Sequence, residues 1–279
     1  MRVILGYDGS PAAAAAIDVG ATLFPGAHGF ITYLWGPPFA SEQVRRRLWE
    51  HARNIDTLTA AVEREGEREA HWVTGLGVSL ARAAGWQAEP LLERTFAGEG
   101  TGLVRAADKS DADLVIVGSR GLGGSDAILG SVSDIVVHHC SRPVVVVPHP
   151  MLSVEYDALA AGPVVVGWDG STNAEAALAA ASRLLPHRHF VAVSVDDDSD
   201  PPAPESVGDA RVTRVRVNRG RGRHAHAVAQ ALIAAADEHG TALVVVGSRG
   251  RSVAREIILG SVAMGTLHHC HRPVMVVPG

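Results

Sequence analysis

The sequence predicts an α/β fold made of two tandem domains, each a doubly wound, five-stranded parallel sheet. Two observations lead to this prediction. The chain repeats itself, because residues 3–25 resemble 164–186 and residues 115–148 resemble 244–278. In each copy, apolar runs of strand length alternate with helical segments. We therefore expect two sheets of the same topology in one chain.

The expected strands of copy one are Val, Ile and Leu runs without clean alternation, as in parallel strands buried on both faces. Expected strands span 2–7, 29–34, 88–94, 113–118 and 143–147, and expected helices span 11–23, 41–65, 100–109 and 131–139. The helix over 41–65 is predicted from apolar residues at helical spacing between Val44 and Val62, with arginines between them.

Copy two repeats this order but is shorter in its middle. Its strands are expected near 163–168, 189–195, 211–217, 242–247 and 273–277. The offset between the copies falls from 161 residues at the first strand to 129 at the fourth, so 32 residues are missing. The stretch 196–210 is too acidic and proline-rich to replace the helix 41–65. We expect the sheet face left without that helix to be covered by copy one, by a second chain or by 196–210.

We expect domains over 1–150 and 163–279, joined by a linker over 151–162. The chain has 279 residues, of which 47% are hydrophobic and 20% charged, which is typical of globular protein. Its apolar runs are too short to span a membrane and its start has no signal-peptide pattern, so a cytoplasmic protein is expected. A net charge of -5 gives no general attraction to nucleic acid or anionic lipid.

The candidate site of each copy lies at the carboxyl ends of the first and fourth strands, where doubly wound sheets bind ligands. Asp8 or Asp169 follows the first strand, placed to accept a hydrogen bond from a ribose hydroxyl or an amino group; capping of the next helix is the alternative role. Glycines follow the fourth strand and a Gly-Ser pair opens the last helix, so backbone N–H groups and the helix dipole would face an anion. These residues are Gly118, Gly121, Gly130 and Ser131 in copy one, and Gly247, Gly250, Gly260 and Ser261 in copy two.

Three common catalytic or cofactor motifs are absent. There is no G-x4-G-K-[ST], and Lys109 is the one lysine in the chain, which excludes a P-loop phosphotransferase. The dinucleotide fingerprint G-x-G-x-x-G fails because the glycines follow the fourth strand rather than the first. The nucleophile elbow G-x-S-x-G fails because Val117 precedes Gly118. What remains is G-x2-G-x9-G-S, complete in copy two.

With this motif, over most of both halves, the sequence resembles the universal stress protein family. The resemblance implies that the Asp after the first strand and the end of the second strand hold an adenosine, which corresponds to Asp8 and Leu34 in copy one and Asp169 and Val195 in copy two. It also implies that the motif glycines and serine, with Arg249 between the first two glycines, line the ribose and phosphates.

The resemblance further implies what the protein does. Members of the family bind ATP or related adenine nucleotides with little or no turnover, so the expected cofactor is ATP, ADP or AMP, with Mg²⁺ as its counter-ion. The residues themselves offer no general base beside the phosphates and no two-metal acidic cluster, so no catalytic residue is assigned. The expected role is regulation under stress, with a homodimer or an unidentified protein as partner. The alternatives are an interaction scaffold with vestigial pockets and a slow ATPase.

Copy one departs from the motif because eight residues, not nine, separate Gly121 from Gly130. The missing residue could narrow the phosphate loop, but Gly123 and Gly124 lie inside it and can adopt backbone geometries closed to other residues. We expect a reshaped site that still binds the nucleotide. The alternative is a site that no longer binds it.

Other clusters have simpler explanations. The triplets His138-His139-Cys140 and His268-His269-Cys270 contain metal-ligating types, but adjacent residues diverge around a helix, so helix-end histidines and small buried, reduced cysteines are expected instead. The arginine-rich run 211–226 is interpreted as an edge strand protected by charge rather than as a nucleic-acid site.

The last strands, Val144–Val147 and Val274–Val277, are apolar and bounded by proline. The family resemblance implies that they pair with each other in an internal pseudo-dimer. Ordinary edge strands are the alternative.

Overall fold

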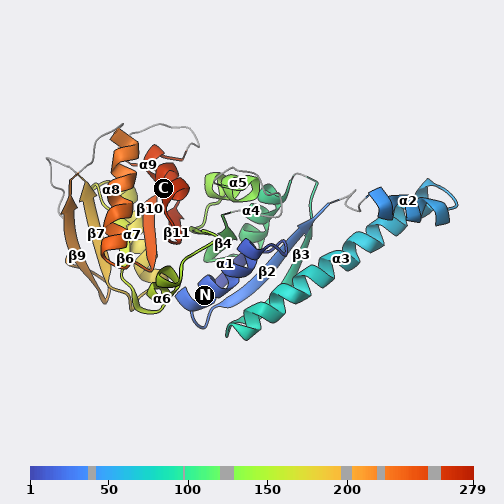
Figure 1. Cartoon of the computed structure of the whole chain (residues 1–279), viewed down its shortest axis with the longest axis horizontal. Helices are drawn as coiled ribbons and strands as arrows, with labels where there is room; N and C mark the ends of the chain where they lie inside the picture. Colours follow the sequence, from blue (N-terminus) through green and yellow to red (C-terminus); the bar gives the residue numbers. More distant parts are fainter. Residues whose placement is uncertain (37–41, 97, 120–128, 196–202, 219–223, 251–258) are drawn as a thin grey trace.

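The two copies form one continuous sheet of eleven strands in a computed structural model, which describes residues 1–36, 42–96, 98–119, 129–195, 203–218, 224–250 and 259–279. The strand order is β3-β2-β1-β4-β5-β11-β10-β6-β7-β9-β8 (Figure 1). Every pairing within each copy is parallel except that of the short β8 with β9. The predicted doubly wound α/β class is therefore confirmed.

The elements follow the predicted order. Copy one contains β1 (Arg2–Gly6), α1 (Pro11–Leu23), β2 (His28–Trp35), α2 (Glu42–His51), α3 (Ile55–Ala83), β3 (Gln87–Arg94), α4 (Glu99–Lys109), β4 (Leu114–Gly118), α5 (Ser131–His139) and β5 (Val144–Val147). After α6 (Ser153–Ala161), copy two contains β6 (Val164–Gly167), α7 (Thr172–Leu184), β7 (Phe190–Val195), β8 (Ser206–Val207), β9 (Ala210–Val217), α8 (His224–Glu238), β10 (Leu243–Gly247), α9 (Ser261–His269) and β11 (Val274–Val277).

The copies are joined by antiparallel pairing of β5 with β11. Val145 lies opposite Met275 in this register, and all four residues of both strands are buried. The internal pseudo-dimer is confirmed, and the alternative of two edge strands is wrong because each strand is paired on both sides.

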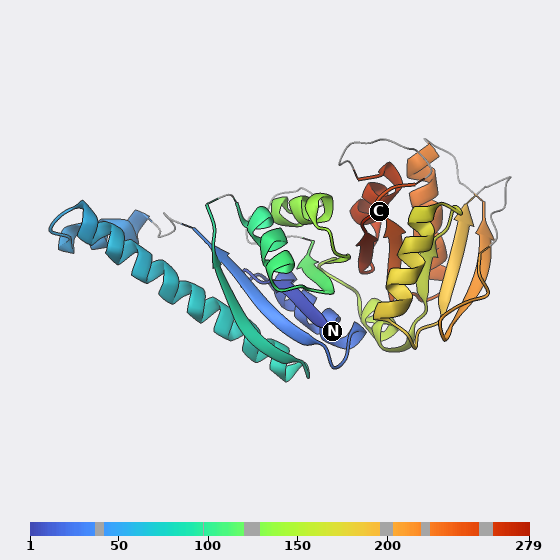
Figure 2. The ribbon, with the colours of Figure 1, turned by 180° about the vertical axis from the view of Figure 1, so that it is seen from behind.

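Helices cover both faces of the continuous sheet (Figures 1 and 2). Helices α1, α3, α6 and α7 contribute to one core, which contains Ile17, Val78, Leu159 and Leu178. Helices α4, α5, α8 and α9 contribute to the other core, which contains Leu103, Val136, Leu232 and Leu267. Each core contains residues of both copies, so the seam at β5 and β11 is also a packing interface.

The prediction of a single helix over 41–65 is wrong. The structure has two helices here, α2 and α3, and α3 is longer than the helix that was predicted. Asn54 ends the first by capping α3, because its Oδ1 accepts a hydrogen bond from the Thr57 N–H (2.9 Å) and Thr57 Oγ1 accepts one from the Asn54 N–H (3.1 Å). Helix α3 then continues to Ala83 through Gly66 and Gly77. A Cβ on Gly77 would lie 2.7 Å from Ile31, so a glycine permits close packing on the sheet. The α2 end of α3 extends beyond the sheet (Figure 1).

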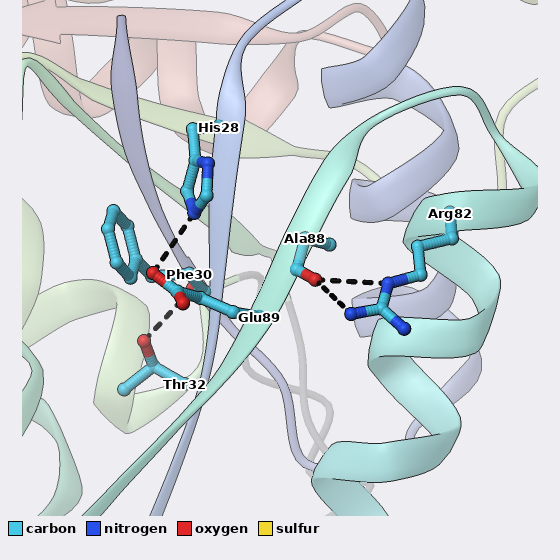
Figure 3. A network of polar contacts seen from close by, with 6 residues as sticks. All are labelled: His28, Phe30, Thr32, Arg82, Ala88 and Glu89. Carbon is cyan, nitrogen blue, oxygen red and sulfur yellow. Dashed lines mark hydrogen bonds and ion pairs between the residues drawn. The ribbon is translucent and has the colours of Figure 1, made fainter.

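Polar contacts connect the outer strands of copy one to the end of α3 (Figure 3). Arg82 donates two hydrogen bonds to the Ala88 carbonyl oxygen, from Nε (3.1 Å) and Nη2 (2.9 Å). Between β2 and β3, His28 Nε2 lies 3.0 Å from Glu89 Oε1. Within β2, Thr32 Oγ1 donates to the Phe30 carbonyl oxygen (3.1 Å). The His28–Glu89 contact is exposed and contributes little stability. Between α3 and β3, the Arg82 bonds are accompanied by an ion pair in which Arg94 Nη2 lies 2.7 Å from Glu63 Oε1.

Copy two has no helix in the described part, 203–209, of the connection that contains α2 and α3 in copy one. In copy one, Trp86 packs over Gly29, where a Cβ would lie 2.7 Å from the indole. The repeat places Phe190 at the position of Gly29 and Ala210 at that of Trp86, and Phe190 is fully buried. The volume that Trp86, the residue before β3, fills in copy one is thus supplied from β7 in copy two.

The rest of that face in copy two is covered in part by residues of the same chain, and exposed arginines lie on the remainder. Ala203 and Val207 pack against the core, so of the three coverings considered, the stretch 196–210 supplies at least part. Farther along β9, Arg214 and Arg216 are exposed on the same face as the buried Val212. These arginines lie on the outer strand pair of the sheet, as expected of an edge protected by charge.

The segment expected as a linker, 151–162, contains the helix α6. Leu159 is buried in the shared core, and Arg188 donates to the carbonyl oxygens of Leu159 and Gly162, the latter at 3.1 Å. The domain limits at 150 and 163 stay a prediction. Among the described residues, no helix combines the length and the hydropathy needed to cross a bilayer.

Replacing Phe190 with alanine should destabilise the chain by about 3–5 kcal/mol, because a fully buried phenyl ring is removed from the part of the core that has no α3 equivalent. Urea unfolding followed by circular dichroism measures this loss. Phe96→Ala is the matched control, since Phe96 is 80% exposed and its removal should change the free energy of unfolding by less than about 1 kcal/mol. Equal stability of the two variants would show that Phe190 does not support this face.

Candidate functional site

The carboxylates after the first strands are held in the same turn in both copies. The Ser10 N–H donates to Asp8 Oδ1 (2.9 Å), and the Ser171 N–H donates to Asp169 Oδ1 (3.0 Å). The two serines cap the following helices, since Ser10 Oγ accepts from the Ala13 N–H (3.1 Å) and Ser171 Oγ from the Ala174 N–H (3.2 Å). Capping is therefore the role of the serines, while each Asp is fixed in orientation at the end of its strand.

In copy two the structure brings the carboxylate and the glycines together. A Cβ on Gly250 would lie 3.3 Å from Asp169 Oδ2, so the second carboxylate oxygen is directed toward the glycine turn after β10. A Cβ on Gly260 would lie 3.2 Å from the Ser248 carbonyl oxygen and 3.9 Å from the Gly250 nitrogen. Residues separated by about ninety positions in sequence thus meet at one sheet edge, as predicted for Asp169, Gly250 and Gly260.

Gly247, at the end of β10, is constrained by its neighbours. A Cβ there would lie 3.1 Å from the carbonyl oxygens of both Asn173 and Arg249. This glycine lets the end of β10 pass close to the start of α7. Arg249 is half-buried in the turn that follows. Gly247 therefore has a packing role as well as a place in the motif.

The last helix of each copy begins without a side-chain cap. Gly130 and Gly260 are the N-cap residues of α5 and α9, and within the described residues no side chain hydrogen-bonds to the first turn of either helix. Each cap glycine donates its own N–H to a serine carbonyl oxygen in the preceding turn, Gly130 to Ser119 and Gly260 to Ser248, both at 2.7 Å. The first turns of α5 and α9, which begin at Ser131 and Ser261, are thus places where helix N–H groups could bind an anion.

Copy one shares this frame and differs in one buried contact. A Cβ on Gly118 would lie 2.9 Å from the Ala12 carbonyl, so the fourth strand again passes close to the first helix. Ser133 Oγ donates to the Gly118 carbonyl oxygen (2.6 Å), whereas the equivalent residue in copy two is Ala263. Gly121 and the shortened loop lie outside the described residues. The proposal that this site still binds a nucleotide therefore rests on the residues on either side of the loop.

The two second-strand residues lie at the expected edge, but their side chains belong to the core. Leu34 is buried in β2, where its methyl groups would lie 3.2 Å from a Cβ on Gly102 of α4. Val195 ends β7 and packs against the same core. Contact of Leu34 with a ligand therefore falls to its backbone atoms, whereas Val195 is only partly buried.

Three titratable residues near Asp8 were missed by the motif search. Burial and the neighbouring Asp8 carboxylate raise the pKa of Glu99, at the start of α4. Burial also raises the pKa of Tyr33, with further contributions from Glu69, Glu99 and Asp8, and the pKa of Tyr7 is raised by burial and then by Asp8. The candidate site of copy one thus has other acidic groups near Asp8. The sequence signal for this difference was that copy two has no acidic residue at the position equivalent to Glu99.

The His-His-Cys triplets show no metal-ligating geometry. Within the described ranges, no group of three or more His, Cys, Asp or Glu side chains could hold a metal ion. Both cysteines are buried free thiols, and burial raises the pKa of Cys270 to about 12, so it is protonated at neutral pH. Burial and His269 lower the pKa of His268, while Asp134 of copy one opposes this shift.

Comparison with known proteins agrees with the repeated architecture. The model of the universal stress protein family matches residues 1–148 and 161–278. A universal stress protein of Mycolicibacterium smegmatis is 34% identical over 189 residues, covering 61% of this chain and 63% of the relative. One of Mycobacterium tuberculosis is 31% identical over 185 residues, covering 60% and 62%. The chain thus spans less than two thirds of these relatives.

Among solved structures, a universal stress protein of Archaeoglobus fulgidus has the same fold, with a TM-score of 0.68 at 19% identity, covering 99% of this chain and 98% of that one. Because the family model matches nearly the whole length in two segments, the chain belongs to the universal stress protein family and contains two tandem copies of its domain.

Proposed function

We propose that this chain is a cytoplasmic stress-response regulatory protein that binds ATP, or ADP or AMP, in two sites of unequal quality, with copy two as the stronger site. Family membership and the site geometry both support the proposal. Mg²⁺ would accompany the nucleotide as a counter-ion to its phosphates.

One observation carries the proposal: in copy two the Asp169 carboxylate, the Gly250 turn and the uncapped start of α9 converge. A carboxylate oxygen suits a ribose hydroxyl, and backbone N–H groups at a helix start suit phosphate oxygens. Gly250 and Gly260 leave room because a Cβ on either would enter this space. A ligand with a sugar at one end and phosphates at the other fits this arrangement.

The described side chains also support binding with little or no turnover. Asp169 already accepts the Ser171 N–H through one oxygen, and Ser261 is the other polar side chain that the motif places at the start of α9. Binding, unlike turnover, does not require a base-and-nucleophile pair that activates water or a hydroxyl. A slow ATPase remains the enzymatic alternative.

A second candidate function, an interaction scaffold with vestigial pockets, is favoured by the outer face of α3. Trp72, Leu76 and Leu80 recur at four-residue spacing and are exposed to 71%, 46% and 36%. An exposed apolar stripe of this kind is typical of a protein-contact surface. The scaffold hypothesis does not require bound nucleotide, which separates the two candidates experimentally.

The nucleotide content of purified protein should distinguish them. Denatured protein should release close to one equivalent of adenine nucleotide if only copy two retains it, and up to two if both copies do. Chromatography of the supernatant identifies ATP, ADP or AMP and measures the ratio to protein. No released nucleotide, together with no calorimetric binding of ATP, would reject nucleotide binding and favour the scaffold.

Replacing Gly260 with valine should weaken ATP binding in copy two by ~100-fold or more, since a side chain over the start of α9 blocks charge-assisted hydrogen bonds to phosphate. The backbone of Gly260, at φ -61 and ψ 146, is open to valine, so the fold should survive. Isothermal titration calorimetry measures the affinity and circular dichroism checks the fold. Gly130→Val is the matched control, because it should remove binding in copy one only; unchanged ATP affinity in Gly260→Val would mean that the phosphates bind elsewhere.

A further inference from the structure

The outer side of α3 carries two adjacent rows of exposed side chains, one large and one small. The large row is apolar, and its members are exposed to 71%, 46% and 36%: Trp72, Leu76 and Leu80. The small row consists of the exposed residues Gly75, Ser79 and Ala83. Residues four apart form one ridge on a helix surface, and residues three apart lie on neighbouring ridges. The helix therefore presents a ridge of large side chains beside a shallow groove over the small ones.

The groove is open at Gly75. A Cβ there would have no other heavy atom within 4 Å, whereas a Cβ on Gly77, on the sheet side of α3, would lie 2.7 Å from Ile31. The packing of the chain itself thus requires glycine at 77 but not at 75. Glycine destabilises an exposed helix interior relative to alanine, so the open groove at Gly75 suits a contact from outside the chain.

Copy two shows that the fold does not need an exposed apolar row. From residue 163 onward, no large hydrophobic side chain among the described residues is exposed. That half also has no helix in the described part of the connection that corresponds to α3. The large row therefore belongs to a helix that copy one has in addition to the shared fold, and an exposed apolar patch of this kind is typical of a protein-contact surface.

The two rows are complementary to each other, which makes a second molecule of this chain the partner that they fit. When two helices cross at about 50°, the ridges formed by residues four apart enter the corresponding grooves of the other helix. A two-fold axis that runs between the rows places the large row of each molecule on the small row of the other. The same surface thus supplies both the side chains and the space that receives them.

Polar residues at the end of the rows agree with this arrangement. Glu69 lies on the next ridge beyond the large row, three residues before Trp72, and His71 precedes Gly75 on the ridge of the small row; both polar residues are exposed. Because the axis reverses the order of the ridges between the molecules, Glu69 of each faces the ridge that carries His71 of the other. A carboxylate opposite an imidazole N–H provides complementary hydrogen bonding at the rim of the contact.

The exposed area of the rows is sufficient for a small dimer interface. A specific interface buries at least about 1,000 Å² in total, which is about 500 Å² from each molecule. Trp72 alone offers roughly 200 Å² at its exposure of 71%. The two leucines and the small row bring the sum to roughly 500 Å². Tryptophan is also among the residue types that contribute most to the affinity of interfaces.

We propose that α3 is a dimerisation helix, and that residues 72–83 of two molecules pack against each other across a two-fold axis. This contact is separate from the pairing of β5 with β11, which joins the two halves of one chain. It requires no bound nucleotide, so its test is independent of the test of the proposed function.

Sedimentation equilibrium of the full chain tests the dimer. The mass should rise from 29.2 kDa toward twice that value as the protein concentration increases from about 1 to about 200 μM. Leu76→Glu should raise the dissociation constant by at least ~100-fold, because it places a charge from each molecule in an apolar contact. Val154→Glu is the matched control, since Val154 is 61% exposed on α6, outside the rows, and its replacement should leave the dimer intact.

Gly75→Leu separates packing into the groove from general apolar adhesion. The monomer should keep its fold and unfold at an equal or higher urea concentration, because the position is open and leucine favours a helix more than glycine does. The dimer should weaken by at least ~10-fold, because the added side chain fills the groove. The inference is overturned if the wild-type mass stays at 29.2 kDa over the whole range, if Leu76→Glu leaves the dimer unchanged, if Val154→Glu weakens it equally, or if Gly75→Leu strengthens it.

Discussion

The antiparallel pairing of β5 with β11 is the interaction on which the rest of the molecule depends. It closes the open edge that each five-stranded sheet would otherwise expose, with Val145 opposite Met275 at its centre. It also sets α5 and α9 on the same face of the sheet, since both contribute to one core. Asp134 of α5 influences the pKa of His268 in α9 across this seam. The helices that begin at the two candidate sites are therefore neighbours.

The copies conserve packed volume while exchanging the residues that supply it. Trp86 over Gly29 in copy one becomes Ala210 with Phe190 in copy two. Cores of native density tolerate such paired exchanges because the total volume is unchanged. The polar residues at the sheet edge are not under that constraint, so the two sites can diverge in charge while the fold is retained.

Sequence reasoning predicted the elements whose limits are marked by local chemistry. The helices over 11–23 and 131–139 have the predicted bounds because a capping serine precedes the first and a Gly-Ser pair opens the second. The helix over 41–65 was wrong because its true break depends on the Asn54 cap, and because glycines such as Gly77 face the sheet at close range instead of ending the helix.

The same contrast applies to the candidate site. Asp169, Gly250 and Gly260 meet as predicted, since parallel strands deliver their ends to one edge. The buried side chain of Leu34 and the approach of Glu99 to Asp8 could not be predicted, because they depend on how α4 packs against β2 and α5. Periodicity along one helix contains no information on the distance to another.

The core that contains Leu159 also has a thermodynamic consequence. Because its members come from both copies and from the connecting α6, the hydrophobic interiors of the two halves are continuous. The two halves should lose their structure in a single cooperative transition. A ligand bound at either edge then raises the melting temperature of the whole chain by mass action, including the half that it does not touch.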